Sequence, residues 1–98
     1  MNPILHLNKL FESRVRLGIM SALMVNASIS FNELKELLDI TDGNLASHIK
    51  PLEENKMIKT KKSFIGKKPN TEFMITAAGE KAFREHLSAL ENMIRNSK

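Results

Sequence analysis

Between Thr41 and Lys50 the chain carries a run of small polar residues. Asparagine can form two hydrogen bonds with adenine, serine can bond to several base edges, and lysine can reach guanine or phosphate. A helix that is merely solvated usually carries glutamate, lysine and glutamine instead. The run predicts a helix that contacts double-stranded DNA, although a second helix of an ordinary helical domain explains it about equally well when taken alone. The candidate contacts are Thr41, Asp42, Gly43, Asn44, Ser47, His48 and Lys50.

Lysines dominate a second stretch, because six of them lie between Lys56 and Lys68 with no Asp or Glu among them. The whole chain has a net charge of +4, which favours an acidic partner. Lysines on an edge hairpin could serve only to prevent aggregation. They continue through the predicted tip, however, and this fits a hairpin lying along phosphates. The candidate contacts here are Lys61, Lys62, Lys67, Lys68, Pro69 and Asn70.

Residues at the predicted helix starts form a third group, which could bond to DNA phosphates. Arg14 and Arg16 lie near the start of one helix, where simple solvation explains them about equally well. Ser30 and Asn32 lie at the start of the next helix, where free backbone N–H groups can also bind a phosphate.

The sequence offers little for catalysis or metal binding. Cysteine is absent, and His6, His48 and His86 are scattered without metal-ligand spacing. We find no nucleophile–base pair and no phosphate-cradling glycine loop. The neighbours Ser47 and His48 point in different directions on a helix, so they form no dyad. We therefore expect no enzyme activity, no metal and no cofactor, while a small-molecule effector stays open.

The chain length of 98 residues is enough for one domain with a modest core. No apolar run reaches the roughly 18 residues that a membrane span needs. The N-terminal residues are neither basic nor apolar enough for a signal peptide.

Two short helices within residues 31–52, a helix-turn-helix, should position the DNA candidates. Ser30 and Glu33 have the spacing of a capping box, and Thr41 is a natural cap for the second helix. Pro51 should kink that helix at Lys50 or end it there, because proline inside a helix costs about 3 kcal/mol or more. The inward residues predicted from helical spacing are Phe31, Leu34, Leu37 and Leu38, then Leu45, Ile49 and Leu52.

The remaining elements complete a mainly α-helical fold with a small β-hairpin (α+β), in one domain of residues 1–98. Ser13 and Thr76 should cap the helices that precede and follow the hairpin. The predicted elements are an N-terminal helical arm (1–12), a helix (14–25), a short strand (27–29), a hairpin or wing (57–75) with strands at 57–65 and 71–75 and a five-residue tip at 66–70, and a last helix (77–96).

Apolar residues on the last helix follow a short heptad spacing, which is typical of helices that pair. A rod of about 30 Å is hard to cover within a chain of this size. We expect a homodimer through this helix and the N-terminal arm, although the helix could fold back on its own core. His86 should be a packing residue. The predicted dimer contacts are Leu5, Leu7, Leu10, Phe83, Leu87, Leu90 and Ile94.

Three segments resemble small winged helix-turn-helix transcriptional regulators of the broad MarR/ArsR-like group. They are T-D-G-N-L-A-S-H-I (41–49), I-G-K-K-P-N-T-E-F (65–73) and I-T-A-A-G-E-K-A-F (75–83). Each is weak alone, and the combination is fairly specific. The chain departs from the group at Pro51, where such helices usually carry Lys or Arg. It also lacks the cysteine sites of ArsR-type sensors and the longer helical ends of larger MarR proteins.

The resemblance implies a prokaryotic, cytoplasmic homodimer that binds a pseudo-palindromic operator. It implies that Lys67, Lys68, Pro69 and Asn70 lie at the wing tip, near the minor groove or its phosphates. The residues that it implies at the major groove are Thr41, Asp42, Gly43, Asn44, Ser47 and His48. The function expected is sequence-specific regulation of transcription, in which the bound protein blocks polymerase, as a repressor does, or recruits it. A winged-helix protein-interaction module and a non-specific DNA-coating protein are the alternatives.

Overall fold

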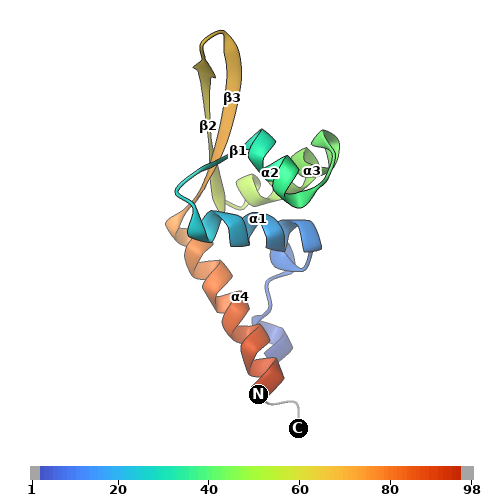
Figure 1. The fold of residues 1–98 in the computed structure, drawn as a ribbon. Helices are drawn as coiled ribbons and strands as arrows, with labels where there is room; N and C mark the ends of the chain where they lie inside the picture. The colour runs from blue at the N-terminus through green and yellow to red at the C-terminus, as the bar shows by residue number, and fades with distance from the viewer. Residues whose placement is uncertain (1–2, 96–98) are drawn as a thin grey trace.

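A computed structural model describes residues 3–95, and it has the element order of a winged helix (Figure 1). The predicted α+β class is confirmed. The outer ends of the predicted arm (residues 1 and 2) and of the last helix (residue 96) lie outside the described residues. The elements are η1 (Pro3–His6), η2 (Lys9–Phe11), α1 (Arg14–Val25), β1 (Ile29–Ser30), α2 (Phe31–Leu38), α3 (Asp42–Glu54), β2 (Ile58–Ile65), β3 (Lys68–Ile75) and α4 (Ala77–Arg95).

The helices begin where hydroxyl side chains cap them, as the sequence predicts. Ser13 accepts a hydrogen bond from the Arg16 N–H, and Thr41 accepts one from the Asn44 N–H. Ser30 and Glu33 form both bonds of a capping box. A hydroxyl cap contributes about 1 kcal/mol to helix stability. Local chemistry therefore places the start of α3, and with it the first residues of the candidate interface.

Of the two alternatives predicted for Pro51, a kink at Lys50 or an end there, the end of the helix at Lys50 is wrong. Helix α3 runs from Asp42 to Glu54 as one element with Pro51 inside it. Leu45, Ile49 and Leu52 are all buried, and burying each such side chain contributes about 1.5–3 kcal/mol. Together they outweigh a proline cost of about 3 kcal/mol. Lys50 therefore stays on the helix and is exposed.

The second strand of the hairpin is longer, and the turn is tighter, than predicted. Ile65 pairs with Lys68, so the tip is the two-residue turn Gly66–Lys67 and not the predicted five-residue tip. Gly66 has a φ of 64°, a conformation that glycine adopts without steric cost and that two-residue hairpin turns favour. Pro69 therefore lies within β3, opposite Phe64.

Strand β3 tolerates Pro69 because this end of the strand lies on an edge of the sheet. The strand order is β1-β3-β2, and β1 pairs only with Phe73 and Glu72 of β3. Proline lacks the N–H that a central strand would donate, so it is confined to such edges. The short strand expected at 27–29 is β1 (Ile29–Ser30), which ends one residue later than predicted.

A single core lies between α1, α2, α3 and the sheet, and it includes most of the residues predicted to face inward. Phe31 and Leu38 are partly buried and pack against this core, whereas Leu37 is largely exposed. Phe11 of η2 and Phe83 of α4 close the core from the other side, with ring centroids 5.2 Å apart and an edge-to-face angle of 89°. The core residues are Phe11, Ile19, Met20, Ala22, Leu23, Ile29, Leu34, Leu45, Ile49, Leu52, Ile58, Phe73 and Phe83.

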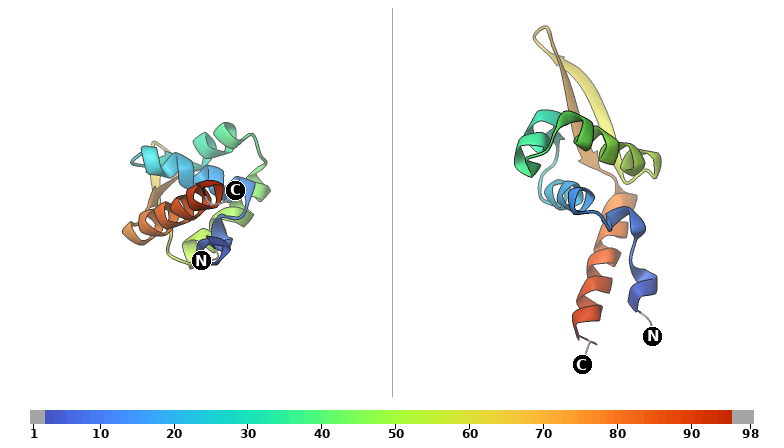
Figure 2. Two further views of the ribbon diagram at one scale, coloured as in Figure 1. Left: turned by 90° about the horizontal axis from the view of Figure 1, so that it is seen from below. Right: turned by 90° about the vertical axis from the view of Figure 1, so that its right-hand side faces the viewer.

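Helix α4 leaves the core on the side opposite the hairpin, and η1 lies beside it (Figure 2). The molecule is accordingly elongated, at 56 × 25 × 21 Å. The hairpin and the free end of α4 therefore lie at opposite ends of the molecule, which separates the wing from the predicted dimer contacts.

None of the helices within residues 3–95 is long and apolar enough to cross a membrane.

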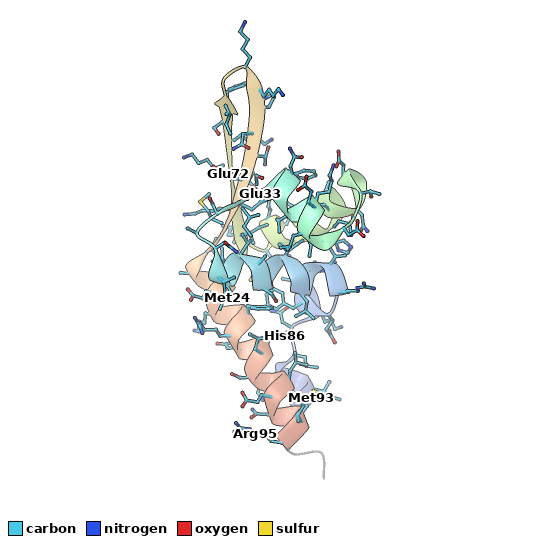
Figure 3. The ribbon with its side chains drawn as sticks, in the orientation of Figure 1. Met24, Glu33, Glu72, His86, Met93 and Arg95 are labelled. Atoms are coloured by element: carbon cyan, nitrogen blue, oxygen red, sulfur yellow. The ribbon has the colours of Figure 1, made fainter. Side chains whose placement is uncertain are left out.

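The N-terminal segment covers one face of α4, and this corrects part of the predicted dimer surface. Phe83 is buried in the protein's own core, and Leu10 packs against that core. His86 is a packing residue, as predicted (Figure 3). Its Nδ1 accepts a hydrogen bond of 3.0 Å from the Asn8 N–H. Burial lowers the pKa of His86, and the charge of Glu12 opposes this shift.

Candidate nucleic-acid interface

The outward face of α3 presents the polar residues that the sequence singled out. Gly43, Asn44, Ser47 and Lys50 are all exposed, because the buried residues of α3 hold the opposite face against the core. The Asn44 N–H is used by the Thr41 cap, but the Asn44 side chain is exposed. The Ser47 hydroxyl donates to the Asn44 carbonyl oxygen at 2.8 Å, which leaves its lone pairs available as acceptors.

Asp42 would repel phosphate if it were unpaired, and a lysine on the neighbouring helix neutralises it. The Lys35 Nζ lies 2.8 Å from the Asp42 Oδ1. The hydrogen bond to Asp42, reinforced by its charge, raises the pKa of Lys35. The sequence reasoning did not name Lys35. Its spacing of seven residues from Asp42 spans two helices, so no single helical repeat relates the two side chains.

The wing lysines that the sequence grouped together lie on both faces of the hairpin. Successive residues of a strand point to opposite faces, so Lys61 and Lys62 cannot share one. Lys61 lies directly opposite Glu72, whereas Lys62 lies opposite Thr71. Cross-strand partners share a face, so Glu72 reduces the positive charge on the Lys61 side.

The face of the hairpin that carries Lys62 lines a groove between the hairpin and α3. Lys50 and Lys62 both line it, and Glu53 lies among them with its carboxylate accepting a hydrogen bond from the Thr60 hydroxyl. Two lysines from separate elements therefore border the space beside α3. The lining residues are Phe31, Ala46, Ile49, Lys50, Glu53, Thr60, Lys62, Thr71 and Phe73.

The wing tip combines positive charge with exposed apolar side chains. The sequence analysis predicted the charge but not the apolar side chains. Lys67 and Lys68 are exposed, and Phe64 is 73% exposed. Pro69 and Asn70 do not lie in the turn as predicted, because they pair with Phe64 and Ser63 along the strands. The exposure of Phe64 and Ile65 could have been predicted from the sequence only if the hairpin register had been known.

The predicted phosphate contacts at the helix starts fall into different environments. Arg14 is exposed and borders a recess that Asn44 also lines, which places it beside the start of α3. Ser30 already donates its N–H to Glu33 within the capping box, whereas Asn32 is exposed. Arg16 is not simply solvated, since its side chain contacts other parts of the protein. Its guanidinium contacts the Leu10 carbonyl and the His48 ring.

The arrangement suits binding and offers no assembled metal site within the described part of the chain. No three His, Cys, Asp or Glu side chains come together there. The geometry instead provides an exposed polar helix face, a basic groove edge and a basic hairpin tip.

Comparisons with known proteins agree with this geometry. A family model described as "Winged helix DNA-binding domain" matches residues 15–94. An uncharacterized protein from Methanocaldococcus jannaschii is 40% identical over 88 residues, which is 90% of this chain and 96% of that protein. The solved structure of a transcriptional regulator homologue from Pyrococcus horikoshii has 38% sequence identity and a TM-score of 0.86, and the match covers 100% of this chain and 99% of that one.

More distant structures share the fold. A MarR-family transcriptional regulator from Enterococcus faecalis has 22% identity and a TM-score of 0.72, over 88% of this chain and 76% of that chain. The order of elements and the matched span confirm the resemblance found in the sequence. The chain belongs to the winged helix DNA-binding domain family.

Proposed function

We propose that the protein is a sequence-specific regulator of transcription that binds double-stranded DNA as a homodimer on a pseudo-palindromic operator. The observation that carries this proposal is that Lys50 of α3 and Lys62 of β2 line the same groove. A recognition helix that enters a major groove would bring the hairpin against the adjacent phosphate backbone. Phosphate contacts supply affinity, and base contacts supply sequence preference.

The two kinds of contact are assigned to different elements. Asn44 and Ser47 on α3 would discriminate bases, because amide and hydroxyl groups match base edges. Lys67 and Lys68 at the hairpin tip would bind phosphates. Occupancy of a promoter would then block polymerase or recruit it.

The homodimer is supported by the apolar surface at the far end of the molecule. Leu87 of α4 is 42% exposed, and Leu5 of η1 is 78% exposed, while Leu90 is half-buried. Because α4 and η1 lie side by side away from the hairpin, a second copy could cover them without obstructing α3. A symmetric dimer would place two recognition helices about one turn of DNA apart, roughly 34 Å.

Fluorescence anisotropy tests the proposal directly. One labelled duplex carries the sequence upstream of this protein's own gene, and a second carries the same bases in scrambled order. We expect binding that weakens with salt and favours the upstream duplex. Equal affinity for both duplexes and for a library of genomic fragments would support a DNA-coating protein instead. No binding at low salt would contradict any DNA-binding role and would favour a protein-interaction module.

Asn44→Ala and the pair Lys67→Ala with Lys68→Ala should weaken binding in different ways. Asn44→Ala should reduce the preference for the operator by about 1–3 kcal/mol, because alanine cannot hydrogen-bond to a base edge. The α3 cap should survive, since it uses the Asn44 backbone N–H. The lysine pair should weaken binding to all duplexes alike and reduce the salt slope of the bound dimer by about 4, since each of the two copies loses two lysines and each lysine neutralises one phosphate. If both variants bound every duplex with equally reduced affinity, this division of roles would be wrong.

A further inference from the structure

Arg16 joins three parts of the molecule through a single side chain. Its Nε donates to the Leu10 carbonyl oxygen at 2.5 Å, and its Nη1 lies 2.8 Å from the Nδ1 of His48. Both Arg16 and His48 are half-buried. The guanidinium therefore connects Leu10, near the end of the N-terminal arm, to α3. One of its nitrogens contacts each of these two elements.

This contact decides which ring nitrogen of His48 carries the proton. An arginine guanidinium has only N–H groups and stays protonated, so it can donate hydrogen bonds but cannot accept them. Nδ1 must therefore accept, and a neutral ring then has its proton on Nε2. Burial, followed by the positive charge of Arg16, lowers the pKa of His48, which favours the neutral ring near pH 7.

The position of His48 makes its tautomer relevant to DNA. His48 lies one helical turn after Asn44 and directly follows Ser47 on α3. Its two ring nitrogens are on separate edges of the imidazole, so an Nδ1 turned toward Arg16 leaves Nε2 directed away from the guanidinium. The ring is only partly covered. An acceptor on the partner, such as O6 or N7 of guanine, O4 of thymine or a phosphate oxygen, would complement an N–H at Nε2.

We propose that Arg16 is a positioning residue that fixes His48 in the Nε2–H tautomer, so that the recognition helix presents a hydrogen-bond donor to DNA beside Asn44 and Ser47. This inference rests on the proposed function for its DNA-facing half. Its other half, the tautomer in the free protein, can be measured without DNA. Since Arg16 also bonds to Leu10, the N-terminal segment helps to hold the donor in its place.

Long-range proton–nitrogen NMR of the free protein with labelled histidine, at pH 7.5, tests the tautomer. We expect the His48 resonances to show a protonated Nε2 and an unprotonated Nδ1. Arg16→Lys keeps a donor and should preserve this state, whereas Arg16→Glu supplies an acceptor and should shift the proton to Nδ1 or protonate both nitrogens. A His48 with Nδ1 protonated in the unaltered protein, or one that is unchanged in Arg16→Glu, would overturn the inference.

Two substitutions of His48 test its use on DNA. The Gln amide can place an N–H near the position of Nε2, whereas the Asn amide places one near Nδ1. His48→Gln should therefore bind the operator within about threefold of the unaltered protein, and His48→Asn should bind about tenfold more weakly. Thermal unfolding of both variants checks that each is folded. Equal affinities for the two variants would overturn the DNA-facing role.

The two experiments also separate this inference from the proposed function. If the unaltered protein failed to prefer its operator over scrambled DNA, the proposed function and the donor role would both be overturned. The NMR measurement would still decide whether Arg16 sets the tautomer of His48.

Discussion

Replacing Gly79 with alanine should lower the free energy of unfolding by about 3 kcal/mol or more. A Cβ at this position would lie 1.9 Å from the carbonyl oxygen of Met57 and 2.7 Å from its carbonyl carbon. The obstacle is backbone, so no side-chain rotation can relieve it. The same Met57 oxygen accepts a hydrogen bond of 3.1 Å from the Thr76 N–H, so moving it away would also disrupt the start of α4. Urea unfolding followed by circular dichroism measures the change.

Gly43→Ala is the matched control, because Gly43 is also in a helix but has no atom within 4 Å of an added Cβ. That variant should be neutral or more stable by about 0.5–1 kcal/mol, as expected for alanine in a helix. If Gly79→Ala and Gly43→Ala had the same stability, the close approach of α4 to Met57 would not be present in solution. The Thr76 hydroxyl accepts from the Gly79 N–H at 2.8 Å and lies 2.7 Å from the Lys56 carbonyl oxygen, to which it donates, so the cap of α4 also contacts this loop.

Substituting Leu87 with glutamate should convert the proposed dimer to a monomer and weaken operator binding by about 100-fold or more. Leu87 is 42% exposed on α4 and would be covered by the second copy. Burying a charge without a partner is strongly unfavourable. A dimer gains about 10²–10⁴ in affinity because its second half-site binds intramolecularly, and a monomer does not have this advantage. Sedimentation velocity measures the oligomeric state, and anisotropy measures the affinity.

Val25→Glu provides the same chemical change at an apolar side chain that is 82% exposed at the end of α1. It should leave both the oligomeric state and the affinity for DNA close to those of the unaltered protein. An unaltered protein that sediments as a monomer at micromolar concentrations would contradict the homodimer. A Leu87→Glu protein that stays dimeric would show that the interface lies elsewhere.

The local features of the fold could be predicted from the sequence because nearby residues determine them. Ser13, Ser30, Thr41 and Thr76 precede their helices, and each cap depends on a residue only three positions away. The spacing of Leu45, Ile49 and Leu52 defined the inner face of α3 for the same reason. The exposed polar face of the recognition helix follows from that spacing alone.

Tertiary packing decided the features that depend on residues far apart in the chain. Phe83 and Leu87 both occupy positions of the heptad pattern. Phe11 packs against Phe83, however, and Phe83 is therefore part of the core. The hairpin register placed Lys61 opposite Glu72 and Lys62 opposite Thr71, because a positive φ at Gly66 permits a two-residue turn.

The sequence by itself determined the winged-helix order of elements, their caps and the polar face of α3, since these follow from helical periodicity and local hydrogen bonds. Only the tertiary structure decided which lysines border the groove, which side of α4 stays exposed, and that Arg16 contacts a histidine 32 residues away. Burial of three side chains also kept α3 continuous through Pro51. The physical reason is that burial energy and long-range contacts can outweigh local preferences.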